Sequence, residues 1–377
     1  MKRISIDRRP NWQEKLEDIG FTFHSLDGVY WNEGICYEFT AEEIDWIEAV
    51  TGEMDRLCLE AVAYVMEKDL LEKVGVPWRH KDFIRESWKR SDRSLYGRFD
   101  FFFDGDELKL LEYNADTPTS LIESSVAQWM WLEDVFPRHD QFNSIHEKLT
   151  AAFRDIGRSM PGKTPFYFTC VQDHEEDFVN VEYLRDVALQ AGLDARHLFI
   201  EDIGCSREVG RFYDLEGGEI RYLFKLYPWE WMLNDEFADS VPESGMTLFE
   251  PPWKMVLSSK GILPILWEMY PDHENLLPSY FDASRFRGSY VRKPLFSREG
   301  ANIFYRRRFG RSLQTEGTYG TEGSIFQELK ELPCFEGNYA AIGSWIISGE
   351  AAGIGVREDD TPITRNTSRF VPHYFKT

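Results

Sequence analysis

Two apolar runs that carry polar side chains at alternate positions constrain this chain more than any other feature. Arg98 and Asp100 alternate in the first run, and Glu112 and Asn114 alternate at the end of the second. The Asp-Gly pair at 104–105 between the runs is typical of a hairpin turn. Pairing of the two strands would bring Asp100, Glu112 and Asn114 together at one end of a sheet. Two carboxylates and an amide oxygen are hard ligands that suit Mg²⁺ held against nucleotide phosphates, so the hairpin predicts an enzyme.

The competing interpretation is that Asp100 and Glu112 only decorate a solvated face of the hairpin, as most strand carboxylates do. Their convergence with Asn114 and with the cationic Arg98 favours the metal site.

Composition and charge limit the partners that this chain can have. With 377 residues, 42% of them hydrophobic, it can bury a sizeable core, either as two or three lobes or as one large catalytic unit. The net charge of -22 repels phosphate backbones and anionic membranes, so nucleic acids and membrane surfaces are not expected partners. The acidity favours a cationic small molecule such as a polyamine, or else it only secures solubility.

The cysteines and the N-terminus bear on the expected compartment. Five scattered cysteines without a CxxC pair indicate reduced thiols, and neither a disulfide framework nor a zinc site. No apolar run follows the basic start of the chain, and no stretch approaches the roughly 20 apolar residues that span a bilayer. We therefore expect a soluble, cytoplasmic protein.

The order of the predicted elements indicates a mixed α/β (α+β) fold. Residues 1–95 are expected to be mainly helical, with Thr40 and Glu43 forming a capping box at one helix start. A strand at 166–171, a helix at 177–191 and a strand at 196–200 predict a parallel α/β unit. For the last third we predict one antiparallel sheet, with a tight turn at Ser348-Gly349 and strands at 290–293, 301–309, 323–328, 339–347 and 351–356.

Polar segments in the last third suggest contacts to a nucleotide. Lys293 ends a strand, and the loop after it contains Ser297, Arg298, Glu299 and Gly300, whose amides and side chains could cover phosphates. No helix follows, so the segment is neither a Walker A loop nor a GxGxxG turn. A charged hairpin tip would look the same, but triphosphate binding needs both a metal and such basic groups.

Two further segments complete the expected nucleotide site. The stretch Gln327, Glu328 and Leu329 leaves a strand as a hinge that could receive an adenine. Arg357 follows a glycine-rich strand, where a guanidinium could stabilise charge on a transferring phosphoryl group or an acyl phosphate.

Together, these motifs resemble the glutathionylspermidine synthase family. More narrowly, the chain resembles the stand-alone synthetase-like members, which are candidate acid–amine ligases. The resemblance runs over nearly the full length and rests on Arg98-x-Asp100, Glu112-Tyr113-Asn114-x-Asp116-x-Pro118-x-Ser120, Tyr227-Pro228-Trp229-Glu230-Trp231, Lys293-Pro294-x-x-Ser297-Arg298-Glu299-Gly300 and Ser368-Arg369-Phe370. It implies a pre-ATP-grasp-like domain plus a circularly permuted ATP-grasp ligase fold, because the metal residues precede the nucleotide-binding lysines.

The resemblance also implies the cofactors and their ligands. It assigns Asp100, Glu112 and Asn114 to Mg²⁺, of which two ions are expected, and gives Lys260 and Lys293 to the ATP phosphates. It places the adenine at the 327–329 stretch. A capped surface helix starting after Ser258-Ser259 would explain Lys260 equally well.

Substrate contacts follow from the same resemblance. Arg98 and Arg357 would stabilise the acyl phosphate and the transition state. Thr117 and Thr119 stand where the family binds its thiol-tripeptide substrate, often with serines, so the acyl substrate is open. Glu175 and Glu176 match acidic residues near the amine or peptide site, although an acidic helix N-terminus explains them equally well.

The bifunctional members begin with an amidase domain, and we expect this chain to lack it and to start at the synthetase. The expected parts are a helical part at 1–95, the metal-binding hairpin and following helices at 96–160, a pre-ATP-grasp-like α/β part at 161–226 and a nucleotide-binding part at 227–377.

We therefore predict an ATP- and Mg²⁺-dependent ligase that joins a small carboxylate to an amine through an acyl phosphate. The acid is expected to be a small peptide or glutathione-like, and the amine polyamine-like. One alternative is a peptide-type ligase that uses an amino acid as the amine. Another is a nucleotide-binding protein without ligase turnover, which would be free to lose Asp100, Glu112, Asn114 and Arg357.

Overall fold

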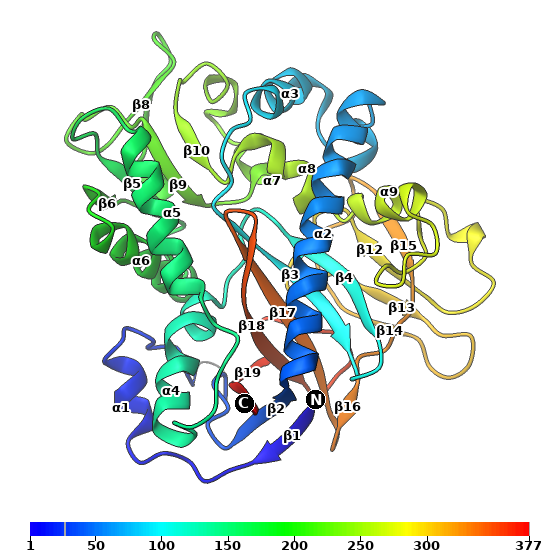
Figure 1. Ribbon diagram of the computed structural model, residues 1–377. Helices are drawn as coiled ribbons and strands as arrows, with labels where there is room; N and C mark the ends of the chain where they lie inside the picture. Colours follow the sequence, from blue (N-terminus) through cyan, green and yellow to red (C-terminus); the bar gives the residue numbers. More distant parts are fainter. Residues whose placement is uncertain (26–27, 377) are drawn as a thin grey trace.

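The computed structural model describes residues 1–25 and 28–376, and its centre is an antiparallel sheet built on the predicted hairpin. Figure 1 shows this sheet running through the middle of the molecule, with the long helix α2 (Ala41–Glu67) across it. The strand order is β19-β18-β17-β3-β4, and β16 adds to β17. These strands are β3 (Tyr96–Phe103), β4 (Leu108–Asn114), β16 (Cys334–Phe335), β17 (Asn338–Ile347), β18 (Glu350–Asp359) and β19 (Arg369–Val371).

A four-stranded parallel sheet lies to one side of this centre, with the order β10-β9-β5-β6. Its strands are β5 (Phe166–Cys170), β6 (Ala195–His197), β9 (Tyr222–Leu226) and β10 (Thr247–Phe249), and α6 (Glu175–Gln190) connects β5 to β6. The predicted strand–helix–strand unit is therefore confirmed, although its helix begins two residues earlier than expected. Strand β10 was not predicted, because three residues inside a proline-rich segment give too short a pattern.

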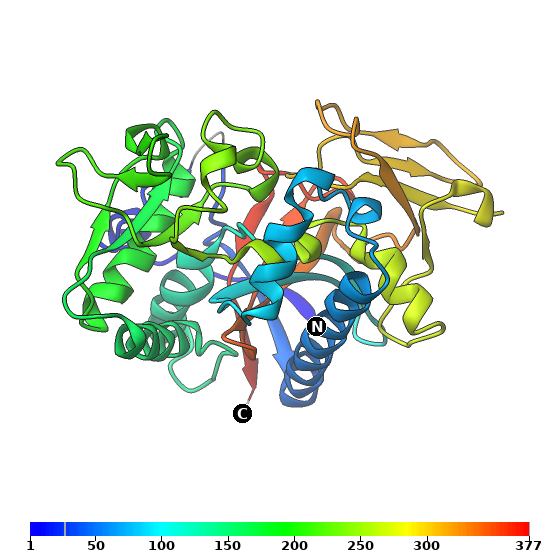
Figure 2. The ribbon, with the colours of Figure 1, turned by 90° about the horizontal axis from the view of Figure 1, so that it is seen from above.

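A five-stranded sheet of order β11-β15-β12-β13-β14 lies on the opposite side (Figure 2). It consists of β11 (Ser279–Tyr280), β12 (Tyr290–Pro294), β13 (Phe304–Arg306), β14 (Leu313–Gln314) and β15 (Ser324–Glu328). The prediction of one antiparallel sheet for the last third is wrong, since β17 and β18 join the hairpin and not β12 and β15. Local alternation predicts strands but does not specify which long-range partner each one takes.

The remaining elements cover these sheets. Strands β1 (Lys2–Ser5), β2 (Ile35–Thr40) and β20 (His373–Lys376) form a small sheet that holds both ends of the chain, and β7 (Gly204–Ser206) pairs with β8 (Arg211–Tyr213). The other α-helices are α1 (Trp12–Glu17), α3 (Lys81–Lys89), α4 (Gln128–Val135), α5 (Ile145–Ser159), α7 (Trp229–Met232), α8 (Met255–Ser258) and α9 (Ile262–Met269). A π-helical turn, Glu123–Ala127, leads into α4.

The structure contains the capping box and the tight turn that the sequence predicted. The amide of Glu43 donates to Thr40 Oγ1 at 3.2 Å and the amide of Thr40 donates to Glu43 Oε2 at 2.9 Å, which confirms the capping box that begins α2. Ser348 and Gly349 both have positive φ, 50° and 83°, in the two-residue turn between β17 and β18. Such values fit the mirror-image turns that match the twist of a hairpin.

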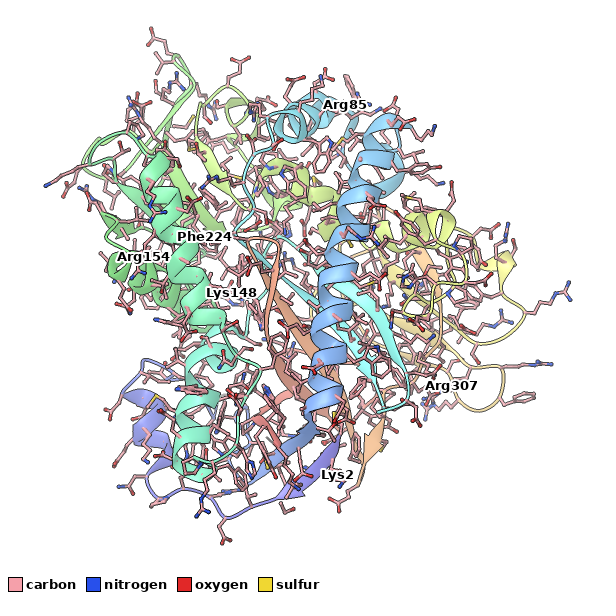
Figure 3. All side chains as sticks on the ribbon, viewed as in Figure 1. Lys2, Arg85, Lys148, Arg154, Phe224 and Arg307 are labelled. Atoms are coloured by element: carbon pink, nitrogen blue, oxygen red, sulfur yellow. The ribbon has the colours of Figure 1, made fainter. Side chains whose placement is uncertain are left out.

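Side chains fill the space between the layers (Figure 3). Phe224 lies inside, fully buried on β9, whereas the labelled Lys2, Arg85 and Arg307 lie at the periphery. Within residues 1–25 and 28–376, no helix is both long and apolar enough to cross a membrane.

One buried ion pair joins the central hairpin to the parallel sheet. Lys225 Nζ, on β9, lies 2.6 Å from Asp116 Oδ1, two residues after β4, and both side chains are fully buried. The second carboxylate oxygen accepts the amide of Trp229 at 2.9 Å, and Lys225 also donates to the carbonyl of Tyr227 at 2.9 Å. Burial lowers the pKa of Lys225, and the Asp116 carboxylate opposes that change.

We predict that Lys225→Met destabilises the protein by about 3–5 kcal/mol, because it leaves the Asp116 carboxylate buried without its cation. Urea denaturation followed by circular dichroism measures the change. The matched control is Lys15→Met, which removes a pair between half-exposed groups, Lys15 and Asp134, and should cost less than about 1 kcal/mol. Equal effects of the two substitutions would show that the buried pair does not hold the sheets together.

Candidate active site

The hairpin places its polar residues as the alternation predicted. In the β3–β4 register, Arg98 faces Asn114 and Asp100 faces Glu112, with an irregularity in the pairing just after Asp100. Asn114 Nδ2 lies 3.0 Å from Asp100 Oδ2 and 3.4 Å from Glu112 Oε1. The orientation of that amide is set by its hydrogen bonds, and turning it would present its oxygen beside the two carboxylates. The structure thus brings together the three residues expected to bind a metal.

Arg98 is fixed beside these carboxylates. Its Nε and Nη2 donate to the two oxygens of Asp100 at 2.7 and 3.1 Å, and its Nη1 donates to the carbonyl of Thr119 at 2.7 Å. Burial disfavours the charged guanidinium, but the Asp100 carboxylate outweighs it, and the pKa of Arg98 is raised. The side chain crosses Gly343 of β17, where a Cβ would stand 2.9 Å from Arg98 Cδ, so only glycine leaves room for it.

Two lysines lie near the same carboxylates. Lys260 Nζ lies 3.3 Å from Glu112 Oε2 and donates to the carbonyl of Ser297 at 2.6 Å, while Lys293 Nζ donates to the carbonyl of Leu111 at 2.8 Å. Lys260 is 8% exposed and stands between α8 and α9, so the interpretation of it as part of a capped surface helix is wrong.

The charged side chains of Glu112, Lys260 and Lys293 lie close together, and this shifts the pKa values of Glu112 and Lys293. Burial would raise the pKa of Glu112, but Lys260 and Lys293 override it and lower that pKa to about 2. Burial lowers the pKa of Lys293 to about 8, helped by the neighbouring Lys260 and opposed by Glu112. The carboxylate therefore stays ionised at neutral pH and is available as a metal ligand.

The loop between β12 and β13 covers this group. Arg298 Nη2 donates to Thr117 Oγ1, and its Nε lies 3.4 Å from Glu230 Oε1, so the guanidinium connects the loop to the hairpin and to α7. Gly300 has φ 69°, and a Cβ there would lie 2.5 Å from the carbonyl oxygen of Thr364. Both the positive φ and this close approach require glycine at 300.

These segments enclose a cavity of about 460 Å³ at the junction of the central hairpin, the parallel sheet and the β12–β13 loop. Its size is within the range of small-molecule sites. Most of the site residues expected from the sequence line it: Arg98, Asp100, Glu112, Asn114, Thr117, Thr119, Lys260, Ser297, Arg298, Glu299, Gly300 and Arg357.

The adenine segment and Lys293 stand beside the lining. Gln327 and Lys293 share a sheet, because β15 pairs with β12, and Gln327 Nε2 donates to the carbonyl of Leu110 on β4 at 3.3 Å. The backbone amide of Glu328 already donates to the carbonyl of Pro278 at 2.7 Å. Leu329 follows directly at the end of β15, half-buried.

The two glutamates of the 175–176 pair have different surroundings. Glu175 is exposed and accepts a hydrogen bond from Thr22 Oγ1 at 2.6 Å, outside the cavity lining. Glu176 is half-buried, and burial raises its pKa against the opposing Arg357 charge and a hydrogen bond with Thr119. Both residues lie in the first turn of α6, as the helix-start interpretation expected.

Several buried polar atoms of this region have no hydrogen-bond partner within the described part of the chain. Among them are Ser297 Oγ, Arg357 Nε and Glu230 Oε2, from residues that line the cavity, and Gln327 Oε1 beside it. An unpaired buried polar atom costs about 1–3 kcal/mol, so such atoms are typical of places where a ligand completes the bonding. Arg357 keeps one further bond, from Nη2 to the carbonyl of Arg365 at 2.7 Å.

The donor set fits a hard divalent cation with several open positions. Two carboxylates and an amide are oxygen ligands of the kind that Mg²⁺ shares with phosphates and water. In the described ranges, 1–25 and 28–376, no group of three or more His, Cys, Asp or Glu side chains is placed to hold a metal. Any cation at the hairpin would therefore depend on Asn114 and on the ligand itself.

Some residues in or near the site were given no role by the sequence analysis. Lys225 is a single lysine within an apolar strand, and such a residue in a predicted buried strand could have indicated a charged partner. Glu230 sits in an aromatic cluster at the start of α7, and burial raises its pKa although Arg298 opposes this. Tyr319, Arg365 and Asn366 reach the cavity from irregular segments, where no periodicity marks them.

Comparisons with known proteins show which family the chain belongs to. The profile of the family described as "Glutathionylspermidine synthase preATP-grasp" matches residues 3–376. A Haemophilus influenzae protein named as a candidate acid–amine ligase is 43% identical over 392 residues, covering 100% of both chains. The trypanothione synthetase of Crithidia fasciculata is 30% identical over 83% of this chain, and the bifunctional glutathionylspermidine synthetase/amidase of Escherichia coli is 25% identical over 96%.

This mixed α/β chain, with its acidic hairpin facing a basic loop, belongs to the glutathionylspermidine synthase family of ligases. It spans 52% of the length of the trypanothione synthetase and 63% of the Escherichia coli protein. A glutathione synthetase-like effector from Globodera pallida has a similar fold, with a TM-score of 0.57 at 11% identity, covering 99% of this chain and 100% of that one.

Proposed function

We propose that this protein is an ATP- and Mg²⁺-dependent carboxylate–amine ligase of the permuted ATP-grasp type, working through an acyl phosphate. The observation that carries the proposal is the placement of Asp100, Glu112 and Asn114 opposite Lys260 and Arg298 around one cavity. An acidic cluster beside clustered cations suits a triphosphate bound through a divalent ion, because each charge set neutralises part of the other.

The reaction would have two balanced steps. The substrate carboxylate attacks the γ-phosphorus of ATP, an acyl phosphate forms and ADP leaves. The amine then attacks the acyl carbon, phosphate leaves and the proton of the amine passes to solvent or to a nearby base. When bound, two Mg²⁺ ions would neutralise charge on the phosphates.

The chain's own residues would hold charge at each step. Lys260 and Lys293 would bind phosphates, and the loop with Ser297, Glu299 and Gly300 would cover them. Arg98 and Arg357 would stabilise the negative charge that builds on the transferring phosphoryl group. The unpaired Arg357 Nε supports this role, since its donor is left for a ligand.

The substrates follow from chemistry around the cavity. Thr117 and Thr119 line the cavity and offer hydroxyls for a small peptide or glutathione-like acid. Glu176 is half-buried beside the lining and offers a carboxylate for a cationic amine such as a polyamine. The adenine would lie against the 327–329 stretch, where Gln327 Oε1 has no hydrogen-bond partner among the described residues. The five cysteines form no disulfide with one another, which supports a place in the cytoplasm.

The proposal is tested by ADP release from the purified protein with Mg·ATP and a panel of acids and amines. We expect sustained release only when an acid and an amine are both present, with a polyamine among the best amines. If a neutral amino acid outperforms every polyamine, the peptide-ligase alternative replaces the polyamine-like amine. Nucleotide binding without release under any pair would make the protein a nucleotide-binding protein without ligase turnover.

We predict that Glu112→Ala abolishes Mg·ATP-dependent turnover and leaves the protein folded, because it removes a polar ligand from the cavity wall and no core contact. Thermal melting with and without Mg·ATP measures nucleotide binding in the variant. Asp106→Ala, at an exposed position of the same hairpin, should keep the wild-type shift. A Glu112→Ala protein that keeps that shift would exclude Glu112 from the metal site.

We predict that Arg357→Ala lowers turnover by about a hundredfold or more while ATP still binds, as happens when a transition-state donor is lost. Single-turnover ADP formation separates this chemical step from binding. Arg308→Ala, at an exposed position, provides the control. Unchanged turnover in Arg357→Ala would place this guanidinium outside the reaction.

We predict that Glu176→Gln raises the KM for the amine far more than the KM for ATP, because it removes a carboxylate near the cavity. Glu175→Gln is the matched control, since this adjacent side chain is exposed and accepts a hydrogen bond from Thr22 Oγ1. If carboxylates focus a cation, the KM for the amine should also rise with salt. Equal effects of the two substitutions would place the amine elsewhere.

A further inference from the structure

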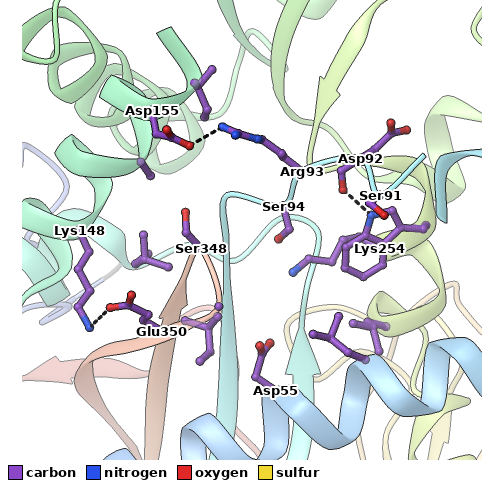
Figure 4. A pocket seen from close by; sticks show the side chains of 18 of the residues that line it. Asp55, Ser91, Asp92, Arg93, Ser94, Lys148, Asp155, Lys254, Ser348 and Glu350 are labelled. Carbon is purple, nitrogen blue, oxygen red and sulfur yellow. Dashed lines mark hydrogen bonds and ion pairs between the residues drawn. The ribbon is translucent and has the colours of Figure 1, made fainter. Parts of the chain in front are cut away.

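A second cavity, larger than the one at the candidate active site, lies on the other face of the hairpin. It has a volume of about 980 Å³ and is lined by α2, α5, the segment before β3, the start of α8 and the β17–β18 turn (Figure 4). Tyr113 lines it, whereas its neighbours Glu112 and Asn114 line the candidate active site. Successive side chains of a strand point to opposite faces, so β4 separates the two cavities.

Most charged side chains of this second cavity already have partners. Two ion pairs stand at its rim, Arg93 with Asp155 at 2.7 Å and Lys148 with Glu350 at 3.1 Å, and both are drawn in Figure 4. The other charged rim groups pair with residues outside the lining, Lys89 with Glu86 and Asp92 with Arg90, each at 2.7 Å.

Lys254 is the buried cation of this cavity and is also satisfied. Its Nζ donates to the carbonyl of Tyr96 at 3.1 Å and to Tyr113 Oη at 3.2 Å, and it lies 3.6 Å from Glu250 Oε2. Glu250 is fully buried and therefore balances the charge of Lys254.

Asp55 is the exception. It is 9% exposed on α2, and Figure 4 shows its carboxylate directed into the cavity. Within the described chain, Asp55 is the one charged lining residue with neither a side-chain hydrogen bond nor an ion pair. Burial raises its pKa, opposed by the charge of Lys254. Counted together with the partners outside the lining, Glu86, Arg90 and Glu250, the charged groups of the cavity leave one negative charge in excess. That charge is on Asp55, which pays desolvation without a partner in the described chain.

The wall around Asp55 is aromatic and aliphatic. Trp88 and Trp253 pack edge to face with ring centroids 5.2 Å apart, and Leu59, Leu257 and Ile346 add apolar surface. Aromatic faces attract cations, and apolar walls hold the hydrocarbon body of a ligand.

We propose that this cavity is a second ligand site, which binds an organic ammonium with an aromatic or aliphatic body, its cationic head paired with Asp55. The site is separate from the proposed catalytic cavity and does not depend on the ligase assignment. Because the two cavities share β4, a ligand in this one contacts the strand that carries Glu112 and Asn114.

The test uses 2-phenylethylamine and its neutral isostere 2-phenylethanol as probes, titrated by calorimetry into the full-length protein without ATP. We expect saturable binding of the amine, at least about tenfold weaker binding of the alcohol, and at least tenfold weaker amine binding in Asp55→Asn. This variant should melt no lower than the wild type, because it removes an unpaired buried charge. Asp45→Asn, at an exposed position of α2, should bind the amine normally.

A second variant fills the site from within the chain. Leu59 is 36% exposed and follows Asp55 by four residues on α2, so the ammonium of Leu59→Lys can reach Asp55 and should block the amine. Glu176→Gln should still bind the probe, since this binding does not use the catalytic cavity. Absent saturable binding, equal binding of amine and alcohol, undiminished binding in Asp55→Asn, or loss of binding in Glu176→Gln would each overturn the proposal.

Discussion

The buried pair between Asp116 and Lys225 is the interaction on which the arrangement of the site depends. It ties the end of the hairpin to the middle of the parallel sheet, with both charges removed from water. The chain after β4 is therefore fixed, and it is this chain that offers Thr117 Oγ1 to Arg298 and the carbonyl of Thr119 to Arg98. A hydrophobic pair could stabilise the same contact. Our hypothesis is that the ion pair is present because it also specifies one orientation of the two sheets.

Alternation along β4 gives one strand two separate chemical environments. Glu112 and Asn114 face the cavity whose cations are proposed to bind phosphates. Tyr113 faces the cavity that contains Asp55, and its hydroxyl accepts a hydrogen bond from Lys254. The ring of Tyr113 also stacks on Phe99 of β3, with centroids 3.9 Å apart, so the two strands of the hairpin are packed together between the two cavities. A small shift of β4 would therefore move residues on both faces together.

The sequence predicted the parts of the site that depend on local pattern. Strand alternation and the Asp-Gly turn placed Asp100 opposite Glu112, and the capping box marked the start of α2, because both signals lie within a few residues. It did not predict that β17, about 240 residues beyond β3, pairs with that strand, since register between distant strands depends on the whole core. Lys225, Glu230 and Asp55 were missed for the same reason: a buried charge is recognised by its surroundings, and those come from distant segments.

The local charge differs between the two cavities, although the chain as a whole is strongly acidic. The net charge is -22, yet the candidate active site gathers Lys260, Lys293, Arg298 and Arg357 around its carboxylates and so can accept an anion. The second cavity pairs its rim charges and leaves only Asp55 among its described lining without a counter-ion, so it can accept a cation. Charge in both places is set by short-range pairing inside the fold, and not by the surface charge that governs solubility. The two proposals therefore assign ligands of opposite charge to the two cavities that share β4.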